Sequence, residues 1–217
     1  MAAAAVLILA GCSAGERRPV SAAAPDTLPN GLPRVLVPKL ANWSIAWRHA
    51  NARFAPELLV RSDVSTFRFS VYGFGPRAMQ DFRTQAKLQE LSPDSTRSLE
   101  FDMYQDYFRE GGGEVDSAPL LADFKSDTLW QPAFCGTPCS FDGAQWVDDS
   151  RFALTGTTLT GGNADGPPCA FVDIYDLRDG TVARWVLPVV NEVEFERYRA
   201  AYDSILAERF AHARVRS

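Results

Sequence analysis

The stretch CAFVDIYDLRDGTVARWVL, residues 169–187, decides the fold of this chain. Cys169–Asp176 is a short run of apolar and aromatic residues, and Thr181–Leu187 is a second run with the composition of a strand. Arg178-Asp179-Gly180 lies between them, and Asp-Gly between two such runs is a strong signal for a tight β-hairpin. The sequence therefore predicts two antiparallel strands joined by a short turn.

This hairpin belongs to a pattern that occurs twice in the chain. Ser92–Leu99 resembles Val147–Leu154, because each is a turn followed by an alternating strand. Asp123–Leu129 then matches Asp176–Val182 in the same order, and the two offsets are 55 and 53 residues. We expect each unit to contain a turn, a strand, a loop, a strand, an Asp-containing turn and another strand. The alternative is that such turn chemistry recurs in any β-rich protein.

Three short motifs within these units resemble the blades of β-propellers. Ser92-Pro93-Asp94 precedes a strand, Ile174–Leu177 has the sequence IYDL, and Asp179–Thr181 has the sequence DGT. Over residues 92–187 this pattern resembles blades of the WD40 or translocation-protein-B type. A propeller typically needs four or more blades, and this chain has room for two at most. The resemblance therefore implies blade-like meanders in a compact antiparallel assembly without closure.

The segments before the repeat predict two helices and a strand. Trp43–Ala52 is compatible with a short helix that carries its two tryptophans on one face. Asp63–Tyr72 alternates apolar and polar residues, which is typical of a strand. Pro76–Glu90 has loosely helical spacing, and we expect that helix to end at Ser92-Pro93 because a residue before proline avoids the helical conformation.

The C-terminal segment, residues 191–214, has the pattern of an amphipathic helix. Asn191 can cap its start, and Glu194 completes a capping-box-like arrangement. Its larger residues share one stripe: Phe195, Tyr198, Tyr202, Ile205 and Leu206. We expect this stripe to pack on the sheet, with partner binding as the alternative. The predicted fold class is α+β, mainly antiparallel β, with blade-like β-meanders packed with a C-terminal helix.

The N-terminal residues carry a second informative pattern. An apolar run from Ala2 leads into Leu9-Ala10-Gly11-Cys12, which resembles the lipobox of bacterial lipoprotein signal peptides. The run is far shorter than the roughly 20 residues that a transmembrane helix needs. The resemblance implies a removable signal peptide at residues 1–11 and acyl chains such as palmitate on Cys12. The absence of Lys and Arg from this segment is atypical, and the alternative is a buried helix followed by a chance cysteine.

Residues 12–34 follow the lipobox with a composition typical of a tether. They are rich in Ala, Pro, Ser and Gly without apolar periodicity, so we expect the segment to be flexible and residues 35–217 to form a single globular domain. Several acyl chains on Cys12 would anchor the chain stably to a membrane. By the sorting rule of the lipoproteins that it resembles, Ser13 favours the outer membrane in a diderm host.

The whole chain is similar to uncharacterised lipoproteins of environmental and gut bacteria, a family without known catalytic residues. The resemblance implies a lipid-anchored component of the bacterial cell envelope that lies outside the cytoplasm. We expect a non-enzymatic binding or structural role, with an envelope protein or a glycan as partner and no cofactor. The formal net charge of −5 argues against a nucleic-acid partner. Trp130, Trp146 and Trp185 could line a binding surface, although core packing is the favoured interpretation for each.

The remaining cysteines fit an oxidising compartment outside the membrane. Among Cys135, Cys139 and Cys169 we expect one disulfide and one leftover thiol. The intervening Gly-Thr-Pro slightly favours a local loop between Cys135 and Cys139, whereas a bond from either to Cys169 would close a longer loop and stabilise more. A metal site on the three sulfurs is a further alternative, for which neither His49 nor His212 has ligand-like spacing.

An extracytoplasmic hydrolase is the alternative function, and it would need two carboxyl groups about 5–10 Å apart. The candidate acid pairs are Asp102 with Asp106, Asp148 with Asp149, and Asp173 with Asp176. Solvated turn acids are the simpler interpretation of all of them. The chain has no Gly-x-Ser-x-Gly nucleophile elbow, and its glycine runs lack the Lys and Ser/Thr of a phosphate-binding loop.

Overall fold

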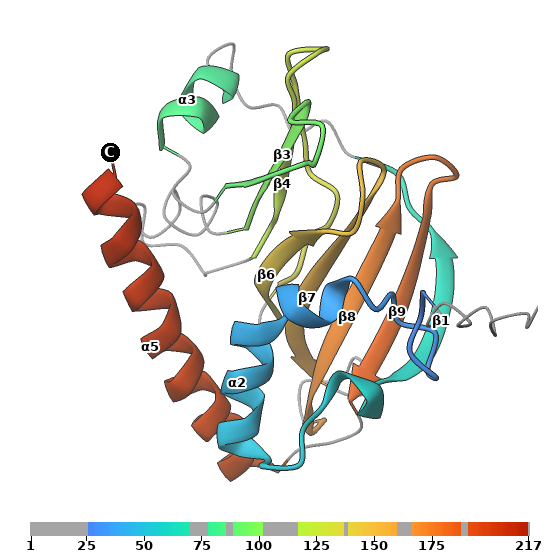
Figure 1. The fold of residues 1–217 in the computed structure, drawn as a ribbon, viewed down its shortest axis with the longest axis vertical. Helices are drawn as coiled ribbons and strands as arrows, with labels where there is room; N and C mark the ends of the chain where they lie inside the picture. Colours follow the sequence, from blue (N-terminus) through green and yellow to red (C-terminus); the bar gives the residue numbers. More distant parts are fainter. Residues whose placement is uncertain are drawn as a thin grey trace, which may run out of the picture.

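Two antiparallel sheets form the body of the molecule (Figure 1). The computed structural model describes residues 26–69, 78–85, 89–101, 117–136, 139–159, 166–187 and 191–216. The first sheet contains, in order, β2 (Glu90–Leu91), β3 (Arg97–Glu100), β4 (Leu120–Asp123) and β5 (Thr128–Trp130). The second contains β6 (Ser140–Trp146), β7 (Arg151–Leu159), β8 (Pro168–Asp176) and β9 (Thr181–Leu187), with β1 (Val60–Thr66) beside β9. The α+β class with mainly antiparallel strands is confirmed.

The duplicated sequence pattern forms equivalent parts of the two sheets. Each unit is a four-stranded meander, β2–β5 in the first sheet and β6–β9 in the second, in which consecutive strands are neighbours. The paired residues correspond position for position: Arg97–Asp123 and Asp123–Thr128 in the first meander, Arg151–Asp176 and Asp176–Thr181 in the second. Recurrent turn chemistry alone would not produce a shared register, so the prediction of two equivalent units is confirmed.

The two meanders stack so that equivalent faces of the two sheets point in the same direction. Ala122 and Tyr175 hold equivalent positions, each directly before the shared aspartate. Ala122 packs toward α3 (Ala78–Gln85) through Phe82, whereas Tyr175 packs in the apolar cluster that joins the two sheets and includes Leu99. If the two sheets formed a symmetric sandwich, the face that carries Ala122 would instead pack against the face that carries Tyr175. The two antiparallel meanders therefore stack in the same orientation, and within the described residues they close no propeller.

Helices cover the outer faces of both meanders (Figure 1). The first is covered by α3, and the second by α2 (Ala41–Ala50) and α5 (Glu192–Arg216), after the short α1 (Leu36–Lys39). Trp47 of α2 stacks on Tyr198 of α5 with ring centroids 4.0 Å apart, and both side chains are completely buried. A 3₁₀ turn, η1 (Pro56–Leu58), precedes β1.

The capping box of the C-terminal helix is confirmed. The backbone N–H of Glu194 donates to Asn191 Oδ1 at 2.9 Å, and the N–H of Asn191 donates back to Glu194 Oε2 at 3.1 Å. The aromatic stripe of the helix packs against both α2 and the second sheet, in the cluster that also contains Ala153 and Val172. The predicted packing role of the stripe is therefore confirmed.

Two predicted element boundaries were wrong. Among the described residues of the predicted helix Pro76–Glu90, Ala78–Gln85 is helical, whereas Glu90 pairs with Leu99 as part of β2. The predicted strand Asp63–Tyr72 begins earlier, at Val60, and its ladder with β9 ends at Thr66. Residues 70–77 lie outside the described part of the chain.

The folded domain also begins earlier than residue 35, where the tether was expected to end. Leu28 and Leu32 are buried in the same core cluster as Trp47. Asn30 fixes this segment by donating from Nδ2 to the carbonyls of Pro56 and Leu59, both at 2.9 Å. Within the described residues, no helix has the length and apolar character that crossing a membrane requires.

Candidate functional site

A polar cavity of about 210 Å³ lies where the helices meet the first strands of the two meanders. Its wall is built by the end of α1, by α2 and α5, and by β2, β6 and β7. The polar lining residues are Lys39, Asn42, Glu90, Asp142, Gln145, Thr155, Tyr202 and Arg209. This is the candidate site, because residues distant in the sequence bring charges of both signs to one hollow.

The two meanders supply equivalent positions to this cavity. Glu90 pairs with Leu99 in the first meander as Gln145 pairs with Ala153 in the second. The two lining side chains contact each other, with Gln145 Nε2 donating to Glu90 Oε1 at 3.3 Å. Arg209 of α5 donates from Nη2 to the same oxygen at 3.2 Å. The repeat therefore shapes one wall, and the C-terminal helix crosses in front of it.

Lys39 brings a second positive charge to the mouth of the cavity. The residue is exposed, and its Nζ donates to the backbone carbonyl of Trp146 at 2.6 Å. Within the described part of the chain no acidic side chain pairs with it. An ammonium group offers three donors, so Lys39 keeps donors for a bound molecule.

Asp142 lies at the buried end of the same cavity. Tyr198 Oη donates to Oδ2 at 2.5 Å, and Ser140 Oγ donates to Oδ1 at 3.0 Å. Burial raises the pKa of the Asp142 carboxyl to about 6, although these two hydroxyl donors act in the opposite direction. The carboxyl group therefore links β6 to α5 and changes charge in mildly acidic solution.

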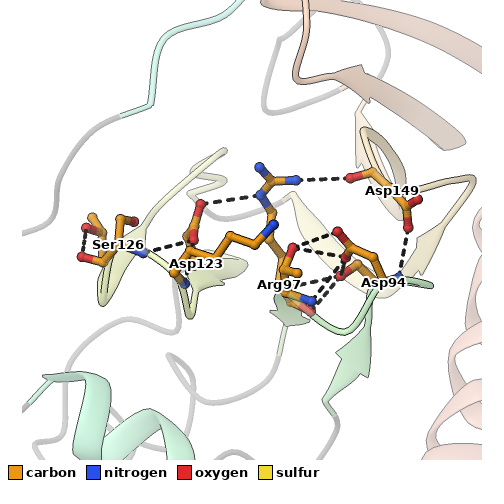
Figure 2. Close-up of polar contacts among 9 residues, drawn as sticks. Asp94, Arg97, Asp123, Ser126 and Asp149 are labelled. Atoms are coloured by element: carbon orange, nitrogen blue, oxygen red, sulfur yellow. Dashed lines mark hydrogen bonds and ion pairs between the residues drawn. The ribbon is translucent and has the colours of Figure 1, made fainter.

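A second polar cluster joins the first turns of the two meanders (Figure 2). Asp149 accepts the backbone N–H of Asp94 at 2.8 Å, and Arg97 Nη1 donates to the Asp149 carbonyl at 3.1 Å. Arg97 also lies 3.4 Å from a carboxylate oxygen of Asp123. Figure 2 shows the guanidinium of Arg97 between Asp123 and Asp149. This cluster holds the meanders in their relative position.

The carboxylates of this cluster are already occupied by donors from the protein. A hydrogen bond from Ser92 and the backbone N–H of Thr96 lower the pKa of Asp94 to about 2. For Asp148, burial acts upward, but the N–H of Ser150 and the guanidinium of Arg151 outweigh it and bring the pKa to about 2. Such carboxylates stabilise turns and stay ionised, so we assign this cluster an architectural role.

In two of the three candidate acid pairs, the two carboxylates have different partners within the protein. Asp148 caps its own turn, whereas Asp149 contacts the other meander. Asp173 pairs with Arg184 of β9, whereas Asp176 pairs with Arg178 in the following turn. The remaining pair, Asp102 and Asp106, lies outside the described residues, as do Gly111–Gly113 and Gly161–Gly162.

Of the two histidines, His49 is exposed at the end of α2. His212 falls in the last turns of α5, where side chains are not described.

The structure pairs Cys135 with Cys139, with Cα atoms 5.4 Å apart, and leaves Cys169 as a buried thiol. This is the local pairing that the turn residues favoured. It removes two of the thiolates that a three-sulfur metal site would need. Burial raises the pKa of the Cys169 thiol, which lowers its reactivity as a nucleophile. Cys12 lies outside the described residues.

The three tryptophans considered for a binding surface differ in burial. Trp146 and Trp185 are buried, and their indole N–H groups donate to the carbonyls of Glu90 and Asn30 at 2.7 and 3.0 Å. Trp130 is half-buried and packs against Phe69. Because a buried indole needs an internal acceptor, these side chains serve the core, and the core alternative is the correct one for Trp146 and Trp185.

Comparison with protein-family models, curated proteins and solved structures gives no match for this chain. The site therefore has to be interpreted from its own chemistry. None of its charged residues, Lys39, Glu90, Asp142 and Arg209, was singled out from the sequence. Each is an isolated residue in an ordinary helix or strand. The one available signal was the repeat itself, which places Glu90 and Gln145 at equivalent positions.

Proposed function

We propose that this chain is a lipid-anchored lipoprotein of the bacterial cell envelope, whose folded domain binds a small polar ligand without transforming it. The observation that carries the binding role is the cavity lined by Lys39, Glu90, Asp142 and Arg209. Concave sites with a few convergent polar groups are the usual places for small ligands. The anchor is supported by the lipobox at Leu9–Cys12.

The binding role is tested by closing the cavity without disturbing the core. Asn42 lines the cavity but is exposed, so Asn42→Trp is expected to obstruct the mouth and leave the fold intact. His49→Trp, also exposed on α2, is the matched control because it adds the same side chain away from the cavity. The full chain is screened by thermal shift against monosaccharides, organic acids and amino acids. A compound that stabilises the wild type and His49→Trp, but not Asn42→Trp, supports the proposal; absence of any such compound contradicts it.

The anchor is tested separately by labelling cells with an alkynyl palmitate analogue. The wild-type chain should incorporate the label and sediment with membranes, whereas Cys12→Ala should do neither. Cys169→Ala is the control, because that thiol is buried. Incorporation into Cys12→Ala at the wild-type level would contradict the anchor.

A hydrolase is the second candidate, because two carboxyl-bearing side chains, Glu90 and Asp142, line the same cavity. The raised pKa of Asp142 is a property that general acids share. Binding ranks first, however, because Ser140 and Tyr198 each occupy one of the Asp142 oxygens. Release of nitrophenol from a panel of nitrophenyl glycosides, lost in both Glu90→Gln and Asp142→Asn, would reverse this order.

A further inference from the structure

The exposure of the lining residues divides the cavity into a mouth and a floor. Lys39 and Asn42 are exposed, and Arg209 and Glu90 are half-buried. Asp142, Thr155 and Tyr202 are buried. The mouth thus carries two cations and one carboxylate, an excess of one positive charge. An anionic group would meet its partners here, away from Asp142.

The side chains of Lys39 and Arg209 have different hydrogen-bond partners within the protein. Arg209 shares an oxygen of Glu90 with Gln145, so a bound anion competes with an internal carboxylate for this guanidinium. Lys39 contacts only a backbone carbonyl among the described residues. A ligand carboxylate would therefore pair with the whole charge of Lys39, whereas it would share the charge of Arg209 with Glu90. Hydrogen bonds to charged groups are roughly twice as strong as neutral ones.

The rest of the lining is suited to hydroxyl groups. Asn42 and Gln145 offer amide donors and acceptors, and Thr155 and Tyr202 carry hydroxyls. Gly143 keeps the floor open, because a Cβ at that position would lie 2.9 Å from Thr155 Oγ1 and 4.0 Å from the Tyr202 hydroxyl. The lining can therefore satisfy several hydroxyls of one ligand.

The volume limits the size of the ligand. A cavity of about 210 Å³ has room for on the order of seven waters at ~30 Å³ each. That corresponds to the size of a single hydroxylated ring.

We infer that the ligand is a small hydroxylated anion of the size of one uronic acid, with its carboxylate between Lys39 and Arg209 and its hydroxyls toward Thr155, Tyr202 and Gln145. This inference rests on the proposed function, because it names the class of ligand that the same cavity takes. It assigns Lys39 and Arg209 the role of charge recognition.

The test is calorimetric titration of the full chain with D-glucuronate, D-glucose and D-glucosamine, which share a ring and differ in charge. Glucuronate should bind at least tenfold more tightly than glucose, and glucosamine should bind no better than glucose. Lys39→Gln should weaken glucuronate about tenfold with little effect on glucose. Arg48→Gln, on the exposed face of α2 outside the lining, is the matched control and should bind as the wild type does.

Glu90→Gln is expected to change the affinity for glucuronate in the opposite direction to Lys39→Gln. Removing the carboxylate releases Arg209 from its internal partner, so glucuronate should bind several-fold more tightly. A circular dichroism melt of each variant checks that the fold is retained. Equal affinity for all three sugars, tighter binding of glucosamine, or weaker binding of glucuronate to folded Glu90→Gln overturns the inference. If no sugar binds but Asn42→Trp abolishes binding of another compound, the ligand class fails and the binding function stands.

Discussion

In the first meander β3 and β4 are four residues long, whereas the equivalent strands of the second, β7 and β8, have nine residues each. The turns do not differ in this way. Asp123 and Asp176 each accept the backbone N–H two residues later, and each turn has a residue with positive φ before the shared threonine. Aspartate turns therefore set the register of a meander, while other contacts set the length of its strands.

The elements that cover the two meanders differ as well. The second meander is covered by α2 and α5 and extended by β1, whereas only α3 covers the outer face of the first within the described residues. Apolar surface buried on both faces of a sheet stabilises it more than burial of one face alone. We therefore expect the second meander to be the more stable unit and the first to open at lower free energy, as subglobal units commonly do.

Removing a large buried ring from each covering helix tests this order most strongly. Trp47→Ala should lower the free energy of unfolding by about 4 kcal/mol, because the ring is completely buried and stacks on Tyr198. Phe82→Ala removes an equally buried ring from α3. Urea unfolding measures the global loss, and amide hydrogen exchange locates it. Phe82→Ala should deprotect β3 and β4 and leave β7 and β8 protected; equal loss of protection in both sheets would contradict the order.

The charge of Asp142 should make the contact between α5 and the second meander sensitive to pH. Its folded pKa of about 6 lies above the ordinary value near 3.9, so the folded state binds the proton more strongly. Stability from this group should therefore increase as the pH falls through 6 and be complete below about 4. The gain is at most about 3 kcal/mol. Its charged neighbours on α5, Arg199 and Asp203, act in opposite directions.

Asp142→Asn should abolish this rise, as measured by the urea midpoint at pH 7 and pH 4.5. The turn carboxylates interfere little in that range, because groups with a lowered folded pKa, such as Asp94 and Asp148, lose their stabilisation mainly as the pH falls below the unfolded value near 3.9. A variant that keeps the wild-type rise would show that another group is responsible.

The structure also shows which features the sequence could predict. The hairpin at Asp179-Gly180, the two equivalent units and the capping box depend on local chemistry, and all were predicted. The start of the domain was misplaced because Leu28 and Leu32 are single apolar residues among prolines and glycine, without a period. Their burial depends on long-range contacts that no local pattern encodes.

The candidate site was not predictable for a related reason. Lys39, Asp142 and Arg209 come from three elements that only the tertiary fold brings together. None of them has a neighbour whose spacing indicates a motif. The sequence also left a tryptophan binding surface open beside core packing, because an aromatic residue in a strand has the same local pattern whether it faces solvent or the core. Burial decides for the core at Trp146 and Trp185.

An ion pair distinguishes the two meanders at a position where the first has neutral residues. Counted from the shared aspartates, Asp173 and Arg184 correspond to Leu120 and Gln131. Asp173 is buried, whereas the side chain of Arg184 is 41% exposed. Arg184→Gln should cost about 2 kcal/mol, because it leaves a buried carboxylate without its counter-charge. Adding Asp173→Leu should restore most of the loss, since replacing both partners removes the unpaired charge. Urea unfolding of both variants measures this, and a double variant less stable than the single one would contradict it.

The smallest expected effect lies in the last turn of each meander, where Gly180 and Asp127 have φ of +67° and +51°. A Cβ at Gly180 would meet only the Phe67 carbonyl at 3.7 Å, an ordinary contact, so the cost of Gly180→Ala is conformational. We expect a loss of about 1 kcal/mol. Gly180→Asn should lose about half as much, because Asn and Asp tolerate this conformation better than other side chains do. Melting temperatures separate the outcomes, with about 2–4 °C per kcal/mol for a chain of this length. Equal stability of Gly180→Ala and the wild type would mean that this turn can relax to negative φ, and then the match with Asp127 would not reflect a shared backbone requirement.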